Sequence, residues 1–199
     1  MKQTLLILTF LIFVINGNSQ EYHSIVNETN NWSVVSGGIG AFFKVCCVET
    51  NHYRFNGDTT IQSTHYKKIL SSTNSINQIW ETIGFIREDT VQKKVWIRDL
   101  ENHEGLVYDF DLSLEEEITL YNPFFWDTIT YQVSEIDSIL IQTEYRKTFK
   151  LNNGGWEEKW IEGIGSEFGI VNSNIFGLAG GFVGSPFLVQ IKSRQFFSF

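Results

Sequence analysis

The sequence predicts an all-β fold, in which an antiparallel meander forms a closed or partly closed barrel, with a two-sheet β-sandwich as the alternative. Short segments alternate apolar and polar residues with a period of two, which is the pattern of half-buried strands. The connections between them are short and rich in polar residues and glycine, and apolar residues do not recur at helical spacing. Roughly nine to eleven such segments follow one another at intervals near 8–12 residues, as in barrels and sandwiches.

The clearest strands lie in the middle of the chain, within residues 84–112. In residues 94–98, Val95 and Ile97 point to one face, and Lys94, Trp96 and Arg98 point to the other. Residues 106–110 alternate in the same way. The connections at 89–93 and 100–104 are short and polar, which predicts antiparallel hairpins, because a parallel crossover needs a dozen residues or more.

Before this centre, residues 32–36, 42–48 and 66–70 are β-prone and predict three further strands, with a helical turn as the alternative for residues 66–70. Asn56-Gly57 lies between β-prone residues. Both central residues of a tight hairpin turn need a positive φ, so the pair predicts a hairpin at this point.

After the centre, Pro123-Phe124-Phe125-Trp126 argues against regular structure and predicts a plug at one end of the fold. Residues 131–141 and 145–151 predict a hairpin, with a bulge near 135–137 where the alternation slips. A glycine-rich turn at 152–155 leads to a strand at 156–161. Glycines 163, 165 and 169 predict a tight loop, and residues 187–192 form the last alternating segment.

The N-terminal residues have the features of an export signal. Lys2 precedes an apolar run at 5–15, and Gly17 and Ser19 are small residues at −3 and −1 of a cut before Gln20. The run is shorter than the roughly 20 apolar residues that span a bilayer. We therefore predict a signal peptide at 1–19, a single all-β domain at 20–199 without a transmembrane segment, and a secreted or periplasmic protein.

Composition excludes several functions. The chain has 199 residues and a formal net charge of −8, and its Lys and Arg residues do not form the clusters that nucleic-acid binding requires. The four histidines stand singly, without the paired spacing of metal ligands, so we expect no metal and no cofactor. The neighbouring Cys46 and Cys47 cannot join distant parts of the chain. We interpret them as packed thiols, or as one thiol pairing with another molecule.

Two sets of residues are candidates for function. Six carboxylates lie on or beside predicted strands with three arginines nearby, and two of them at about 5–10 Å could hydrolyse a glycoside; ion pairs and turn caps are the competing explanation. The carboxylates are Glu88, Asp89, Asp99, Asp109, Asp111 and Glu162, and the arginines are Arg87, Arg98 and Arg146. The second set is Trp126 and Trp156, which fall in or near loops and are candidate ligand-binding residues, with core packing as the alternative.

An ordered set of motifs resembles a family of secreted bacterial β proteins of unknown function, common in bacteria that use type IX secretion. The motifs are FNGDT at 55–59, YKKI at 66–69, GFIRED at 84–89, LVYDF at 106–110, RK at 146–147 and WIEGIGS at 160–166. The resemblance covers roughly residues 50–190 and implies export and a β fold, but no activity. Members of the family often continue into a C-terminal sorting domain. This sequence departs from that pattern, because it ends at Phe199 without room for one.

The predicted function is therefore an exported, non-enzymatic module that binds another protein or a glycan through loops at one end of the fold. Two alternatives stay open: a lipocalin-like barrel that holds a small apolar ligand, and a glycan-active hydrolase that uses a carboxylate pair.

Overall fold

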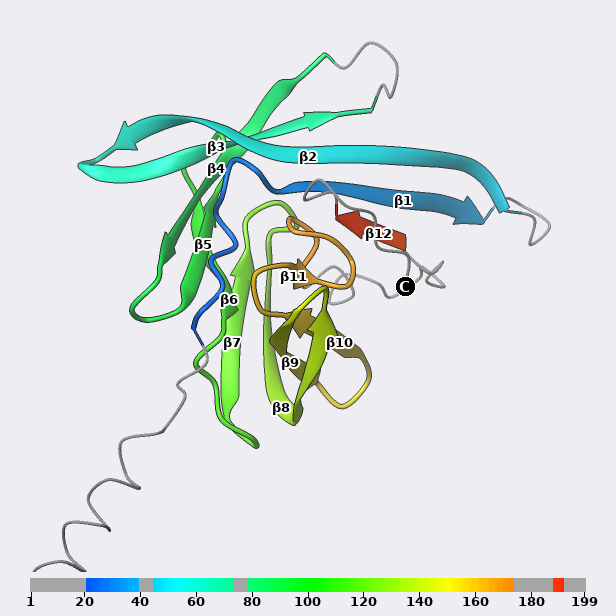
Figure 1. The fold of residues 1–199 in the computed structure, drawn as a ribbon. Helices are drawn as coiled ribbons and strands as arrows, with labels where there is room; N and C mark the ends of the chain where they lie inside the picture. The colour runs from blue at the N-terminus through cyan, green and yellow to red at the C-terminus, as the bar shows by residue number, and fades with distance from the viewer. Residues whose placement is uncertain (1–20, 40–44, 74–78, 174–187, 192–199) are drawn as a thin grey trace, which may run out of the picture.

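The computed structural model describes residues 21–39, 45–73, 79–173 and 188–191, and they form two antiparallel sheets without a helix (Figure 1). The first sheet has the order β12-β1-β2-β3-β4-β5-β6, and the second has the order β11-β10-β9-β8-β7. The strands of the first sheet are β1 (Asn31–Ile39), β2 (Val45–Ile61), β3 (Thr64–Ser72), β4 (Glu81–Asp89), β5 (Lys94–Arg98), β6 (Glu104–Asp109) and β12 (Leu188–Ile191). Those of the second are β7 (Glu117–Asn122), β8 (Asp127–Ile141), β9 (Glu144–Asn152), β10 (Glu157–Ile161) and β11 (Gly165–Ser166).

This architecture confirms the predicted all-β meander. In the part of the chain that the structure describes, strands β1 to β6 and β7 to β11 pair in chain order, and β12 returns to pair with β1. Both sheets curl into half-barrels, an arrangement compatible with a partly closed barrel or a two-sheet sandwich. The slip predicted near residues 135–137 is confirmed as a register shift between Val133 and Glu135.

The hairpin predicted at Asn56-Gly57 is wrong, because β2 continues through these residues as the long cyan strand in Figure 1. Gly57 does adopt a positive φ of 79°, but it forms a β-bulge at the register shift between Phe55 and Asp58. The chain reverses later, at Gln62 and Ser63, whose φ values of 49° and 67° are those of a tight hairpin turn.

The core between the sheets is built from aromatic and β-branched side chains. Tyr108 stacks on Phe110 with ring centroids 5.7 Å apart, and the edge of Trp160 meets Tyr108 at 5.1 Å. Ile25, which lies outside any strand, is also completely buried in this core. The segment before β1 is therefore part of the packed domain.

The two sheets meet closely at β6 and β7. A Cβ on Gly105 of β6 would lie 1.9 Å from the carbonyl oxygen of Tyr121 in β7, a distance that no side chain tolerates. Glycine is therefore needed here, and its absence of a side chain lets the two backbones approach. This contact places the β5–β6 turn beside the β7–β8 turn.

Several predictions lie outside the described part of the chain. They include the signal peptide at residues 1–19, the strand before residue 45, and the state of the Cys46 and Cys47 side chains. Among the described residues, no helix has the length and apolar character needed to cross a membrane.

Candidate functional site

The β7–β8 turn presents Trp126 to solvent on a well-anchored loop. The carbonyl oxygen of Asn122 accepts the backbone N–H groups of Phe125 and Trp126 at 3.1 and 3.0 Å, and the Asn122 side-chain oxygen accepts that of Phe124. The Asn122 side chain is fully buried, and its Nδ2 donates to the carbonyl oxygens of Val171 and Ser173. Trp126, at the end of this turn, is 61% exposed.

His103 lies against Trp126 from the neighbouring β5–β6 turn, with ring centroids 4.7 Å apart and planes inclined by 57°. Asp99 fixes the imidazole, because its Oδ2 is 2.8 Å from His103 Nδ1 and its Oδ1 accepts the His103 backbone N–H. Burial opposes ionisation of Asp99, but the hydrogen bonds from His103 outweigh it and lower the Asp99 pKa. With Nδ1 engaged, Nε2 is the ring nitrogen left to meet a ligand.

Trp156, the second predicted binding residue, is also exposed but belongs to a different place. It ends the β9–β10 turn, where the Asn153 side-chain oxygen accepts its backbone N–H at 2.9 Å. Asn152, just before this turn, pairs with Gln132, whereas the Trp126 turn adjoins Asp127 on the same strand β8. Because Asp127 and Gln132 are five residues apart on β8, the two turns lie about 17 Å apart along the strand. The structure does not bring the two tryptophans together.

The predicted carboxylate Glu88 anchors the segment that precedes β1. It accepts hydrogen bonds from the Tyr22 hydroxyl at 2.7 Å and from the backbone N–H groups of Ile25 and Val26 at 3.0 Å, as well as from the Ser24 hydroxyl. Burial raises the pKa of Tyr22, and the negative charge of Glu88 raises it further. Glu88 therefore acts as an internal acceptor for this segment.

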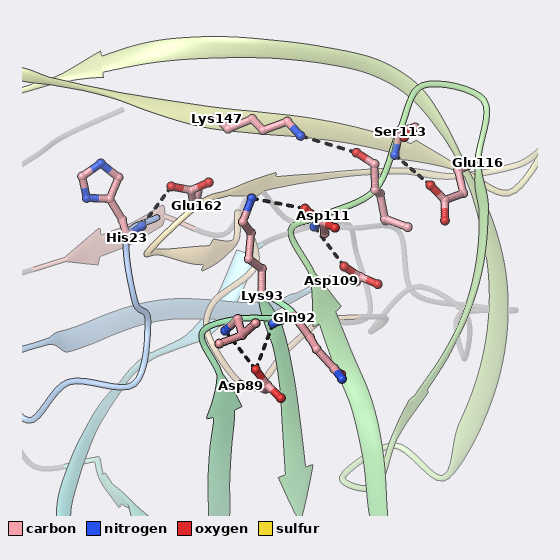
Figure 2. Close-up of polar contacts among 12 residues, drawn as sticks. His23, Asp89, Gln92, Lys93, Asp109, Asp111, Ser113, Glu116, Lys147 and Glu162 are labelled. Carbon is pink, nitrogen blue, oxygen red and sulfur yellow. Dashed lines mark hydrogen bonds and ion pairs between the residues drawn. The ribbon is translucent and has the colours of Figure 1, made fainter. Parts of the chain in front are cut away.

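The other five predicted carboxylates are also engaged within the fold, and Figure 2 shows four of them: Asp89, Asp109, Asp111 and Glu162. Asp89 caps its own turn through the backbone N–H groups of residues 91 and 92, and Asp99 does the same for residues 101 and 103. Glu162 accepts the His23 backbone N–H at 3.0 Å. Lys94 contacts Asp109 at 3.3 Å, and Lys93 contacts Asp111 at 3.2 Å. Ion pairs and turn caps account for the contacts of four of the six, whereas Glu88 and Glu162 accept hydrogen bonds from the segment that precedes β1.

The predicted arginines pair with glutamates that the sequence did not single out. Glu104 of β6 binds Arg87 Nε at 2.5 Å and Arg98 Nη2 at 3.1 Å, and it also accepts the Tyr66 hydroxyl. Burial opposes ionisation of Glu104, but the hydrogen bonds from Arg87, Arg98 and Tyr66 lower its pKa. Arg146 contacts Glu144 at 3.2 Å. These ion pairs give the three arginines a structural role in stabilising the fold.

A pocket of about 350 Å³ lies on the second sheet, lined by Glu135, Asp137, Thr148, Lys150, Glu157, Glu158, Lys159 and Glu167. Lys150 pairs with Glu157 at 3.0 Å, and Glu167 accepts the Lys159 backbone N–H. The described residues contain no group of three or more His, Cys, Asp or Glu side chains placed to hold a metal ion. The lining of the pocket is therefore rich in charged side chains, and Lys150 and Glu157 within it pair with each other.

The best candidate site is the surface formed by Trp126 of the β7–β8 turn and His103 of the β5–β6 turn, called here the Trp126 surface. The sequence analysis selected Trp126 but not His103, which is one of the four histidines that stand singly in the chain. The spacing of Asp99 and His103 across a predicted turn was the available signal. Comparison with known proteins gives no further guide, because no family model, no curated protein and no solved structure matches this chain.

Proposed function

We propose that the chain is an exported, non-enzymatic binding module that recognises the saccharide rings of a glycan at the Trp126 surface. The observation that carries the proposal is Trp126 itself. Its backbone has a φ of 58°, a left-handed conformation that favours glycine or asparagine, and its side chain is 61% exposed. Folding alone does not account for a large aromatic residue there, whereas contact with a ligand does.

The chemistry of the surface favours a sugar. An exposed indole face packs against the C–H face of a pyranose ring, and the oriented imidazole beside it can bind a hydroxyl group. The net charge of −8 disfavours polyanionic ligands. A single exposed ring is also small compared with the roughly 1,200 Å² or more that a stable protein interface buries. A glycan is therefore the better-supported ligand class than a protein.

The other two functions predicted from the sequence stay predictions. A hydrolase would need two carboxylates facing one substrate, and the candidates instead contact lysines, hydroxyl groups and backbone N–H groups. A lipocalin-like role would need space where Tyr108, Phe110 and Trp160 make ring contacts. Neither has a specific observation in its favour.

The test is binding of the purified chain to immobilised cellulose, chitin, mannan and peptidoglycan. We expect retention on at least one polymer and a loss of tenfold or more in affinity for Trp126→Ala, which is about 1.4 kcal/mol. His103→Ala should weaken binding less. Trp156→Ala is the matched control, because it removes an exposed indole elsewhere and should bind normally. Absence of binding by the unmodified chain, or equal loss in the two tryptophan variants, would refute the proposal.

A further inference from the structure

Lys147 occupies an unusual place for a lysine, on the inner face of β9 where the two sheets meet. Side chains alternate along a strand, so Lys147 shares its face with the fully buried Phe149 and Leu151. Its ammonium group lies 4.6 Å from the Phe149 ring centroid. In Figure 2 the side chain of Lys93 extends toward Asp111, and the ammonium group of Lys147 contacts the next residue of that segment, Leu112. The residue is half-buried, so a small molecule can still reach it.

The contact made by the Lys147 ammonium differs from those of other lysines. Lys147 Nζ donates to the backbone carbonyl oxygen of Leu112 at 3.4 Å, a long hydrogen bond to a neutral acceptor. By contrast, the ion pairs of the described residues join Lys67, Lys93, Lys94 and Lys150 to carboxylates at 2.8–3.3 Å. A carboxylate partner stabilises the charged form much more than a carbonyl does.

The electrostatic surroundings of Lys147 also favour the neutral amine over the charged ammonium form. Burial lowers the pKa of Lys147, the positive charge of Lys93 lowers it further, and the charges of Asp111, Glu162 and Asp109 oppose the change without cancelling it. Lys150, three residues along the same strand, has its pKa raised by its hydrogen bond to Glu157. One strand therefore carries two lysines with opposite shifts.

We propose that Lys147 is a covalent attachment site for small neutral aldehydes. A desolvated amine beside a second cation is a known way to make a lysine nucleophilic at neutral pH. The Nζ lone pair forms a bond to the carbonyl carbon, and the carbonyl oxygen leaves as water with the two hydrogens of the neutral amine. The product is an imine, and the step needs no oxidant or reductant. The site is separate from the Trp126 surface and stands independently of the glycan proposal.

The experiment labels the folded chain with limiting propionaldehyde and traps the imine with cyanoborohydride, whose hydride reduces it to a stable secondary amine. Peptide mass spectrometry then gives the rate at each lysine between pH 6 and 9. We expect Lys147 to react at least threefold faster than Lys150 at pH 7, and the preference to disappear in 8 M urea. Equal or slower labelling of Lys147 in the folded chain overturns the proposal, as does a preference that persists in urea.

Two variants separate the cause from simple accessibility. Lys93→Met removes the neighbouring positive charge, so labelling of Lys147 at pH 7 should slow while its rate at pH 9 changes little. Glu157→Gln removes the partner of Lys150 and should speed labelling there. If Lys93→Met leaves the Lys147 rate at pH 7 unchanged, the assigned role of its surroundings is wrong. Circular dichroism of each variant checks that the fold is retained.

Discussion

Glu88→Ala should release the segment that precedes β1, because one carboxylate holds it through four donors. Each buried N–H or O–H left without an acceptor costs about 1–3 kcal/mol. The segment can avoid that cost by undocking into water, since it lies outside the strands, but it then gives up the complete burial of Ile25. Burial of such a side chain is worth about 1.5–3 kcal/mol. The protein will adopt whichever of the two states costs less, the docked segment with unpaired donors or the undocked segment with Ile25 exposed. We therefore expect the free energy of unfolding to fall by about 2–3 kcal/mol.

Urea unfolding followed by tryptophan fluorescence and far-UV circular dichroism measures this loss, with Glu101→Ala, an exposed change, as control. A double-mutant cycle with Ile25→Ala tests the mechanism. Ile25→Ala alone should cost about 2–4 kcal/mol. In the Glu88→Ala background it should cost far less, because the segment has already undocked.

Hydrogen exchange gives a local measure of the same event. The amides of Ile25 and Val26 should lose protection in Glu88→Ala, while those of β5 and β6 keep theirs, apart from the global loss of stability. If the free energy of unfolding of Glu88→Ala falls by less than about 0.5 kcal/mol, water replaces the four hydrogen bonds without cost and the reasoning is refuted. Strict additivity in the double-mutant cycle would also refute the reasoning, because it would mean that Ile25 stays docked without the carboxylate.

Three further predictions concern single contacts. The pKa of Glu104 is lowered from its ordinary value of 4.5, so its ionised form stabilises the fold above that pH and the contribution disappears as the pH falls through the folded-state pKa; urea midpoints should therefore drop more steeply with acid in the unmodified chain than in Glu104→Gln. Asn122→Asp, which removes the buried donor to two carbonyl oxygens, should lower thermal stability by about 2–3 kcal/mol, and no loss would contradict its anchoring role. Gly165→Ala should cost more than Gly154→Ala in urea unfolding: both glycines have a positive φ, but a Cβ at 165 would lie 3.1 Å from Ile25 Cδ1, whereas nothing lies within 4 Å of one at 154. Equal losses would mean that only the backbone matters.

Strands were predictable wherever the chain alternates cleanly, and turns were predictable only in part. Residues 94–98 lie in β5 as expected, because their two faces differ sharply in polarity. At Asn56-Gly57 the local signal correctly required a positive φ at Gly57, but a bulge and a turn both satisfy it. The observed register pairs Phe55 with Ile69, two side chains buried in the core. Long-range packing therefore decided between the two conformations.

The structure of the segment around Ile25 was not predicted because its apolar and polar residues do not alternate. It is irregular, and what fixes it is a carboxylate 62–66 residues later in the chain. The site shows the same limit. Trp126 could be selected from its own loop, but His103 reaches it only because Gly105 and Tyr121 bring two turns from different sheets together. A sequence shows what a residue can do more readily than which residue it meets.

The last prediction separates binding from stability at Trp126. Replacing a buried Trp by a small residue costs about 3–5 kcal/mol, but Trp126 is exposed and holds a left-handed backbone conformation that costs about 1–3 kcal/mol in a residue other than glycine. Asparagine adopts that conformation more readily. In Trp126→Asn, relief of this strain should offset the loss of the His103 contact, worth about 0.5–1.5 kcal/mol. Urea unfolding should therefore change by less than about 0.5 kcal/mol, while polysaccharide binding is lost. A large loss of stability would instead assign Trp126 to the fold, and would remove the main argument for a ligand at this surface.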